Sequence, residues 1–315
     1  MDNSSLLKRV DIACSLDELL NQACRACNIG SLRSYEFLSD GYQELNIKTT
    51  TTQGDFVIKI FSKEKSLKRI QDNIWGYLSF RKQGVPFPVL RKTDRNEYAF
   101  SIPGKKKTSY LCVMEYFDGQ YLRPQKATDD DLLRLTDYMA TIHKNTHRIG
   151  RYYDTMGIAN LLSQFKKFHR YLTDSHEQRV SQVVREYQSL PHNRFRRCII
   201  HGTLESENIL KRDDNLCLLD LGCMDYNAAI YDVATFLANY TLDIPHGEKQ
   251  RRIDLVVNHY QLTLPLVSYE RDALVPLIHA QYAIIYLRTN YYVTKLRDTS
   301  KLTINWLEKA KRGLA

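Results

Sequence analysis

One stretch, residues 199–234, constrains the fold of this 315-residue chain more than any other part of its sequence. Two short apolar segments flank the polar run 211–215, and this alternation predicts a β-hairpin. Asn208 precedes the first expected strand, and Asp220 follows the second. Because the two ends of a hairpin lie close together, an amide oxygen and a carboxylate there can share one hard cation such as Mg²⁺. A polar hairpin with solvated ends is the alternative interpretation.

The order of motifs in this stretch resembles the catalytic core of the aminoglycoside phosphotransferase and choline kinase family. The stretch contains H-G-x-x-x-x-x-N from His201, then a hydrophobic residue followed by Asp220, then Y-D-x-A from Tyr231. The first two motifs are similar to H-R-D-x-x-x-x-N and D-F-G of protein kinases. By this resemblance Asn208 and Asp220 hold Mg²⁺, and Asp232 braces the catalytic loop from the helix that follows.

Thr203 departs from the family pattern, which carries an aspartate there as the base that receives the substrate's hydroxyl proton. A threonine hydroxyl does not ionise near neutral pH, and general-base catalysis contributes about 10²- to 10⁴-fold. Phosphoryl transfer nevertheless depends mainly on positioning and charge stabilisation. Three interpretations stay open: a slow kinase, a kinase with another base, and an inactive nucleotide-binding pseudokinase that acts as a binding or regulatory module. Phosphotransfer is the favoured one.

Glu205 and Glu207 lie in the same loop as Thr203. Glu205 could substitute for the missing base. A solvated loop acid is the favoured interpretation, because charged side chains in loops usually face water.

Lys59 stands in the strand-like run 56–61 between apolar neighbours. On an alternating strand its side chain shares a face with Val57 and Phe61, and a buried lysine needs an anionic partner. An edge lysine that reaches solvent is the alternative. By the resemblance Lys59 binds the phosphates of ATP, as in V-A-I-K, and pairs with a carboxylate of the next helix. The family's glutamate is missing from that helix, and Asp72 is the expected partner.

Two further segments resemble nucleotide-binding parts of the family. The expected strands 45–51 and 56–61, with the loop 39–44 before them, resemble the hairpin that covers the nucleotide. A later strand, 110–117, runs out into an Asp-Gly turn and resembles the hinge, where backbone groups near Glu115 and Phe117 hydrogen-bond adenine. A plain surface hairpin and an ordinary strand end are the alternatives. Residues 46–88 are most similar to the homoserine-kinase-like branch.

The distribution of expected elements predicts the architecture. The first third is rich in strands and contains a helix at about 65–82, whereas the rest is mostly helical, beginning with a helix that Thr128 caps. The sequence therefore predicts an α+β, two-lobed, protein-kinase-like fold. The expected lobes are a β-rich N-terminal lobe, 1–117, and a helical C-terminal lobe, 118–315.

Composition excludes several classes of protein. With 43% hydrophobic and 26% charged residues, the chain is typical of a soluble globular protein. No apolar run approaches the roughly 20 residues of a membrane span, and the N-terminal residues lack the apolar core of a signal peptide, which predicts a cytoplasmic protein. The net charge of +9 is spread along the sequence, which favours a solvated basic face over a nucleic-acid-binding surface. Neither nucleic acid nor membrane is an expected partner.

The seven cysteines are mostly isolated in apolar surroundings. Cys24 and Cys27 form a C-x-x-C, but no second pair follows, so packing is favoured over a metal site.

The resemblance implies ATP and Mg²⁺ as cofactors and a hydroxyl group of a small metabolite as the acceptor. In residues 248–315 lysine and arginine outnumber aspartate and glutamate. Such a field repels a polycation and attracts an anion, which predicts an amino-acid-like or otherwise non-polycationic substrate. Arg288, which stands among several tyrosines, is the candidate anchor for it.

Overall fold

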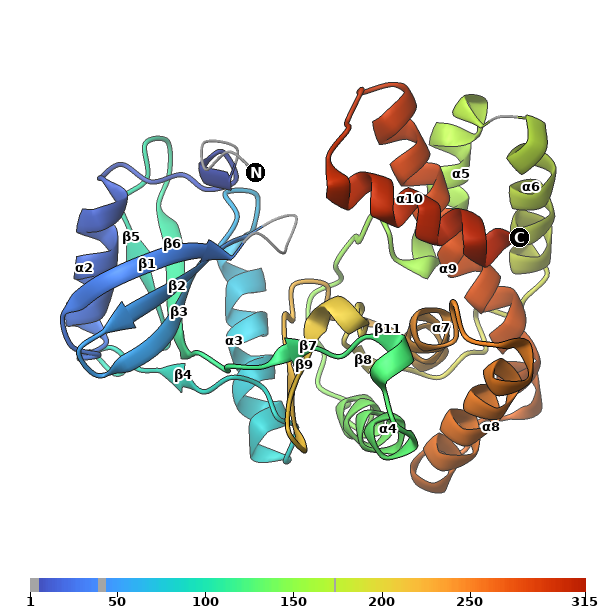
Figure 1. Cartoon of the computed structure of the whole chain (residues 1–315), viewed down its shortest axis with the longest axis horizontal. Coiled ribbons are helices and arrows are strands. Elements are labelled where there is room, and N and C mark those ends of the chain that lie inside the picture. The colour runs from blue at the N-terminus through green and yellow to red at the C-terminus, as the bar shows by residue number, and fades with distance from the viewer. Residues whose placement is uncertain (1–5, 39–43, 173) are drawn as a thin grey trace. The chain divides into compact units, whose positions relative to one another are not determined.

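The fold is described from a computed structural model, which describes residues 6–38, 44–172 and 174–315. The chain forms two compact units, Met1–Gln120 with Leu210–Leu219, and Tyr121–Ile209 with Asp220–Ala315. The first is built on a β-sheet and the second is mainly helical (Figure 1). The predicted α+β class is therefore confirmed.

The sheet of the first unit has the strand order β1-β2-β3-β6-β4, and β5 pairs with β6. Consecutive strands β1, β2 and β3 are antiparallel, and Asn46 lies opposite Lys59. The predicted hairpin is thus present as β2 and β3, while most of its preceding loop, residues 39–43, lies outside the described residues. The strands are β1 (Leu32–Leu38), β2 (Leu45–Thr51), β3 (Gly54–Ile60), β4 (Leu90–Arg91), β5 (Ala99–Ile102) and β6 (Ser109–Glu115).

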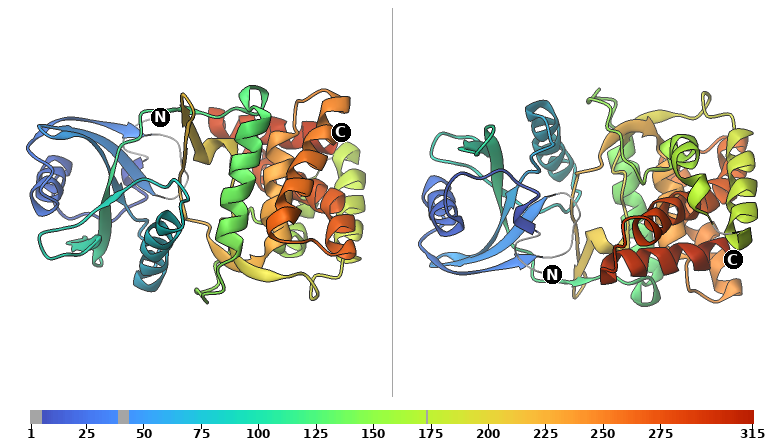
Figure 2. Two further views of the ribbon diagram at one scale, coloured as in Figure 1. Left: turned by 90° about the horizontal axis from the view of Figure 1, so that it is seen from below. Right: turned by 90° about the horizontal axis from the view of Figure 1, so that it is seen from above.

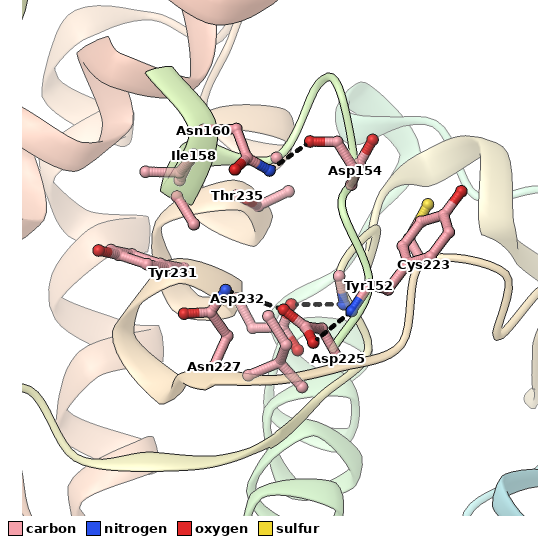
Figure 3. A pocket seen from close by; sticks show the side chains of 14 residues that line it. Tyr152, Asp154, Ile158, Asn160, Cys223, Asp225, Asn227, Tyr231, Asp232 and Thr235 are labelled. Atoms are coloured by element: carbon pink, nitrogen blue, oxygen red, sulfur yellow. Dashed lines mark hydrogen bonds between the residues drawn. The ribbon is translucent and has the colours of Figure 1, made fainter. Parts of the chain in front are cut away.

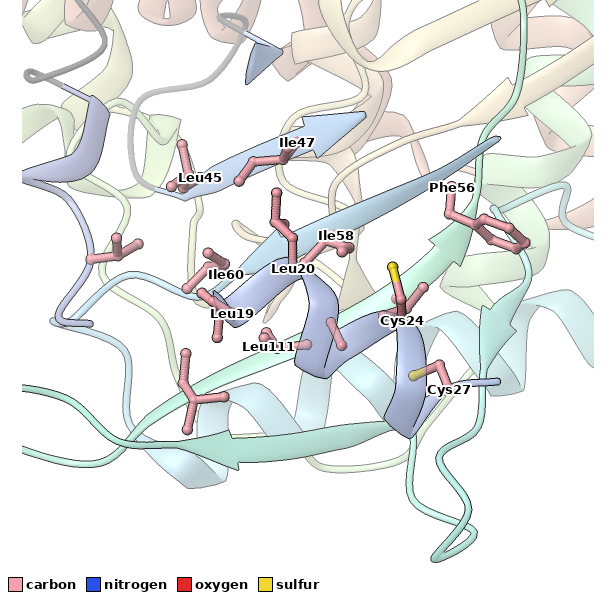
Figure 4. Packing of buried hydrophobic residues seen from close by; sticks show 14 of the residues in the cluster. Leu19, Leu20, Cys24, Cys27, Leu45, Ile47, Phe56, Ile58, Ile60 and Leu111 are labelled. Carbon is pink, nitrogen blue, oxygen red and sulfur yellow. The ribbon is translucent and has the colours of Figure 1, made fainter. Parts of the chain in front are cut away.

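Helix α2 (Leu16–Ala26) covers one face of this sheet (Figure 4). Ser15 caps it by accepting the backbone amide hydrogen of Glu18 at 3.2 Å. Leu19, Leu20 and Cys24 of α2 pack in one cluster with side chains of β2, β3 and β6. Cys24 and Cys27 are buried free thiols in this cluster, so the packing interpretation of the C-x-x-C is confirmed. Nowhere in the described ranges do three or more metal-binding side chains gather.

Helix α3 (Leu67–Lys82) follows β3, close to the predicted limits. Ser66 caps it and accepts from the backbone amide of Arg69 at 3.3 Å. The helix buries Asp72 and Asn73 together with Ile70, Tyr77 and Phe80, so part of its buried face is polar.

The second unit is organised around α7 (Ala229–Tyr240), which is buried along its whole length. Helix α9 packs against α7 and α10, and α4 lies beside α8 (Figure 2). A capping box of Thr128 and Asp131 begins α4, which confirms the predicted cap. The remaining helices are α4 (Asp129–His143), α5 (Leu161–Phe168), α6 (Asp174–Gln188), α8 (His246–Thr263), α9 (Ser268–Thr294) and α10 (Lys301–Leu314).

Two small sheets complete the fold. Strands β9 (Ile209–Arg212) and β10 (Asn215–Leu218) are the predicted hairpin, and β7 (Gln120–Tyr121) extends it in the order β10-β9-β7. The antiparallel pair β8 (Arg197–Ile200) and β11 (Asp225–Ala228) lacks a counterpart in the sequence predictions. Among the residues described, the helices are too short or too polar to cross a bilayer.

Candidate active site

The loop 201–208 connects β8 to β9 and is held by Asp232 of α7. One Asp232 carboxylate oxygen accepts the backbone amide hydrogen of Gly202 at 2.8 Å, and the other accepts that of His201 at 2.6 Å. Charge-assisted hydrogen bonds of this kind are roughly twice as strong as neutral ones. The prediction that Asp232 braces this loop is confirmed.

Asp232 is itself held by His143, the last residue of α4. His143 donates from Nε2 to Asp232 at 3.1 Å, and its Nδ1 lies 2.7 Å from the hydroxyl of Tyr260. Burial alone raises the pKa of Asp232, but the hydrogen bond and charge of His143, the charge of His201 and the amide of Gly202 outweigh it, and the pKa falls below its ordinary value. Asp232 is therefore a buried, ionised support.

Gly202 adopts a left-handed backbone conformation, with φ of +90°. A Cβ atom at this position would lie 2.3 Å from the carbonyl oxygen of Cys223. Position 202 therefore requires glycine for two reasons: its backbone angle is left-handed, and the carbonyl of Cys223 leaves no room for a Cβ atom.

The candidate metal ligands flank the hairpin as predicted. Asn208 directly precedes β9, and Asp220 follows β10 by two residues. Asn208 donates from its side-chain amide to the carbonyl of Thr203 at 2.9 Å, which closes the loop. Asp220 has φ of +55°, and its carboxylate accepts the amide hydrogen of Gly222 at 2.9 Å. An amide and a carboxylate oxygen fit Mg²⁺, which takes few protein oxygens alongside phosphates and water.

Thr203 stands in the middle of this loop, half-buried. Its amide donates to Nδ1 of His201 at 3.4 Å, and its carbonyl accepts from Glu205 at 2.9 Å. Thr203 therefore places a hydroxyl group on a loop that backbone hydrogen bonds keep in position.

Glu205 is buried, with 6% of its surface exposed, so the interpretation as a solvated loop acid is wrong. Burial raises its pKa to about 7, while Lys309 of α10 acts against that shift from 3.8 Å. Lys309 also lies 3.6 Å from Glu207, whose pKa is lowered because Lys309, Ser206 and Arg123 together outweigh burial. Sequence reasoning missed the pairing of Glu205 with Lys309, because Lys309 comes about a hundred residues later in the chain.

A small cavity of about 30 Å³ lies behind the loop (Figure 3). Asp154, Cys223, Asp225 and Asp232 line it together with Gly202. Asp225 accepts from the amide of Tyr152 at 2.9 Å, and burial raises the pKa of Asp154. The cavity is large enough for a water molecule. Its wall includes Gly202 of the loop and Asp232, which holds the loop.

In the first unit, Lys59 is buried and forms an ion pair with Glu44. The prediction of a buried lysine with an anionic partner is confirmed. Lys65, just before α3, forms an ion pair with the other oxygen of the same carboxylate. Asp72 accepts from Lys68 at 2.6 Å, and its pairing with Lys59 stays a prediction.

Glu44 and Lys65 are the members of this ion-pair cluster that sequence reasoning missed. A signal for Glu44 exists in the strand pairing. Asn46 lies opposite Lys59, and Glu44, two residues earlier, points to the same face, where diagonal side chains meet.

The hinge-like strand end lies at the end of β6. The amide of Glu115 donates to the carbonyl of Val89 at 2.9 Å, and the carbonyl of Phe117 accepts from Gly119 at 3.0 Å. The role of Glu115 and Phe117 in adenine binding stays a prediction.

Arg288 of α9, the candidate anchor, is half-buried. Its guanidinium lies 5.2 Å from the ring centroid of Phe168 and 4.8 Å from that of Tyr292. It also donates to Gln164 at 3.4 Å. These contacts fix the cation on an aromatic surface.

Solved structures of several small-molecule kinases are similar to this chain. An amicoumacin kinase in complex with AMP-PNP and Ca²⁺ is 14% identical, with a TM-score of 0.72, over 100% of this chain and 96% of that one. A microcompartment-associated aminopropanol kinase is 14% identical, with a TM-score of 0.65, over 94% and 95%. The choline kinase of Streptococcus pneumoniae is 17% identical, with a TM-score of 0.64, over 95% and 98%.

These likenesses show the fold, and the predicted two-lobed, protein-kinase-like architecture is confirmed. Residues 34–261, well over half of the sequence, match the phosphotransferase enzyme family. The chain therefore belongs to the phosphotransferase enzyme family.

Proposed function

We propose that this protein transfers a phosphoryl group from ATP to a hydroxyl group of a small molecule, with Mg²⁺ as its metal. One observation carries the proposal: the carboxylate of Asp232 accepts hydrogen bonds from the backbone amides of His201 and Gly202. These bonds fix the loop that ends in Asn208. A phosphotransferase needs such a rigid loop, because its catalysis rests on positioning and on stabilising charge.

The proposed roles follow the contacts. Asn208 and Asp220 hold Mg²⁺, which supplies positive charge to the phosphates when bound. Lys59, oriented by Glu44, binds the nucleotide's phosphates, and Asp72 is a second acid for Lys59.

The Glu115 carbonyl and the Phe117 amide hydrogen-bond adenine. The nucleotide-binding residues lie in the N-terminal lobe, 1–117, and the catalytic loop lies in the C-terminal lobe, 118–315.

The binding half of the proposal is tested by titrating ATP with and without Mg²⁺. Asp220→Ala should remove the effect of Mg²⁺ on ATP affinity, because a metal ligand is lost. Asp214→Ala is the matched control, since Asp214 is an exposed acid in the turn of the same hairpin. Wild-type protein that binds no nucleotide, or an Asp220→Ala variant with the wild-type response to Mg²⁺, contradicts the proposal.

We propose an acceptor that is not a polycation, with Arg288 as the anchor for an anionic group. The fixed guanidinium and the basic surplus of the C-terminal helices support this choice. A panel of amino alcohols, hydroxy acids and aminoglycosides, assayed with ATP, tests it. Turnover of aminoglycosides alone contradicts it.

A specific observation, Thr203, favours a second function: a nucleotide-binding pseudokinase. The two are separated by assaying Thr203→Asp beside the wild type. If the threonine marks a lost base, the aspartate should raise turnover by about 10²- to 10⁴-fold. If another base serves, turnover should stay equal or fall, and Glu205→Gln should abolish it. A pseudokinase binds ATP in every variant and phosphorylates nothing in the panel.

A further inference from the structure

We propose that Lys65 is a second phosphate-binding lysine, which together with Lys59 contacts the polyphosphate of the nucleotide. The inference rests on the proposed function, since ATP is its ligand. It adds a binding residue at a position where neither the motifs nor the family resemblance assigns one.

The first support is geometric. Lys65 lies between β3 and α3, and only 3% of its side chain is exposed. Its ammonium group pairs with one oxygen of Glu44, whereas Lys59 pairs with the other. Two ammonium groups that bracket a single carboxylate lie within reach of one polyphosphate chain.

The second support is charge. The ammonium groups of Lys59 and Lys65 both pair with the single carboxylate of Glu44. Lys68 is largely exposed, but the other two lysines are buried. Two buried ammonium groups on one carboxylate repel each other, and an anionic ligand beside them offsets that repulsion.

The third support is the number of donors. A lysine ammonium carries three N–H groups. Lys65 directs one to Glu44 and one to the side-chain oxygen of Asn73 at 3.1 Å. The Phe61 ring lies with its centroid 5.6 Å away and accepts only weakly. The third N–H is therefore suited to a phosphate oxygen.

Lys65→Met tests the proposal by its effect on ATP and on adenosine, which has no phosphate. We expect ATP affinity to fall about ten- to a hundredfold, the usual loss for a charge-assisted hydrogen bond, while adenosine affinity is unchanged. Lys68→Met is the matched control, because Lys68 also pairs with a buried acid but is exposed, and it should leave both affinities unchanged.

Unchanged adenosine binding also shows that Lys65→Met is folded, and Lys65→Arg, which keeps the positive charge, should recover part of the ATP affinity. Wild-type ATP affinity in Lys65→Met, or equal losses for ATP and adenosine, overturns the inference and leaves the proposed function standing. Wild-type protein that binds neither compound overturns both.

Discussion

The carboxylate of Asp232 lies 2.8 Å from the backbone nitrogen of Gly202, thirty residues earlier in the sequence. The same carboxylate accepts from His143, so three segments of the second unit meet at one buried charge. The loop that carries Thr203 and Asn208 is thus fixed from behind by Asp232 and His143, which lie outside it.

Asp232→Ala should lower the free energy of unfolding by about 3–5 kcal/mol, because His143 and two backbone amides lose a buried partner. Urea denaturation measures this loss. Asp137→Ala is the matched control: Asp137 also pairs with a histidine, His259 at 2.8 Å, but on the surface, and should cost less than about 1 kcal/mol. Equal losses in the two variants contradict a special role for Asp232.

Gly202→Ala should reduce both stability and turnover, because its Cβ would meet the carbonyl of Cys223 and the backbone angle disfavours alanine. We expect a loss of about 1–3 kcal/mol, measured by thermal unfolding. In Gly247→Ala, on α8, the added Cβ meets no described atom within 4 Å, and stability should stay equal or rise by up to about 1 kcal/mol. A Gly202→Ala protein as stable as the wild type would exclude this steric argument.

Glu44→Gln should destabilise the first unit by about 3–5 kcal/mol, since Lys59 and Lys65 both lose their shared carboxylate. Glu36→Gln removes an acid that pairs with Lys48 at 3.3 Å but is 65% exposed, and should cost less than about 1 kcal/mol. Both variants are compared by urea denaturation. Addition of ATP to Glu44→Gln should recover stability if phosphates replace the carboxylate.

His192 makes the stability depend on pH. It donates to the carbonyl of Tyr187 at 2.7 Å and accepts from the hydroxyl of Tyr231 at 2.8 Å, and burial holds its pKa below the ordinary 6.5. Its contribution is therefore present above pH 6.5 and is lost as the pH falls below it, because only the unfolded chain gains the proton.

Between pH 6.5 and 5, the free energy of unfolding of wild-type protein should fall more steeply than that of His192→Asn. The difference in slope is at most about 1.4 kcal/mol per pH unit for one proton. Parallel curves for the two proteins contradict this assignment.

The sequence predicted the local elements and the motif-bearing residues well. Alternation predicted the β9–β10 hairpin, and Thr128 with its following acids predicted the start of α4. Asp232 was predicted as a brace from the resemblance of its Y-D-x-A motif to the family pattern. These features depend on residues that are close in sequence or on one continuous pattern.

Features formed by distant segments were missed. Strands β8 and β11 are four residues each and pair across a long separation, so neither has a strong pattern of its own. Glu205 pairs with Lys309 of α10. Lys59 pairs with Glu44, which precedes β2, whereas the sequence pointed to an acid of the helix after β3. Which side chain fills such a position is decided by tertiary packing.

The first unit is interrupted in the sequence, and this limits how the protein can be recombined. Leu210–Leu219 belongs to that unit, the amide of Leu218 donates to the carbonyl of Pro86 at 2.8 Å, and Leu216 is buried there. A fragment that stops at Gln120 would leave that carbonyl without its donor and would uncover apolar surface. A chimera that takes this unit from a relative must therefore also take the relative's hairpin, through a second pair of junctions more than eighty residues downstream.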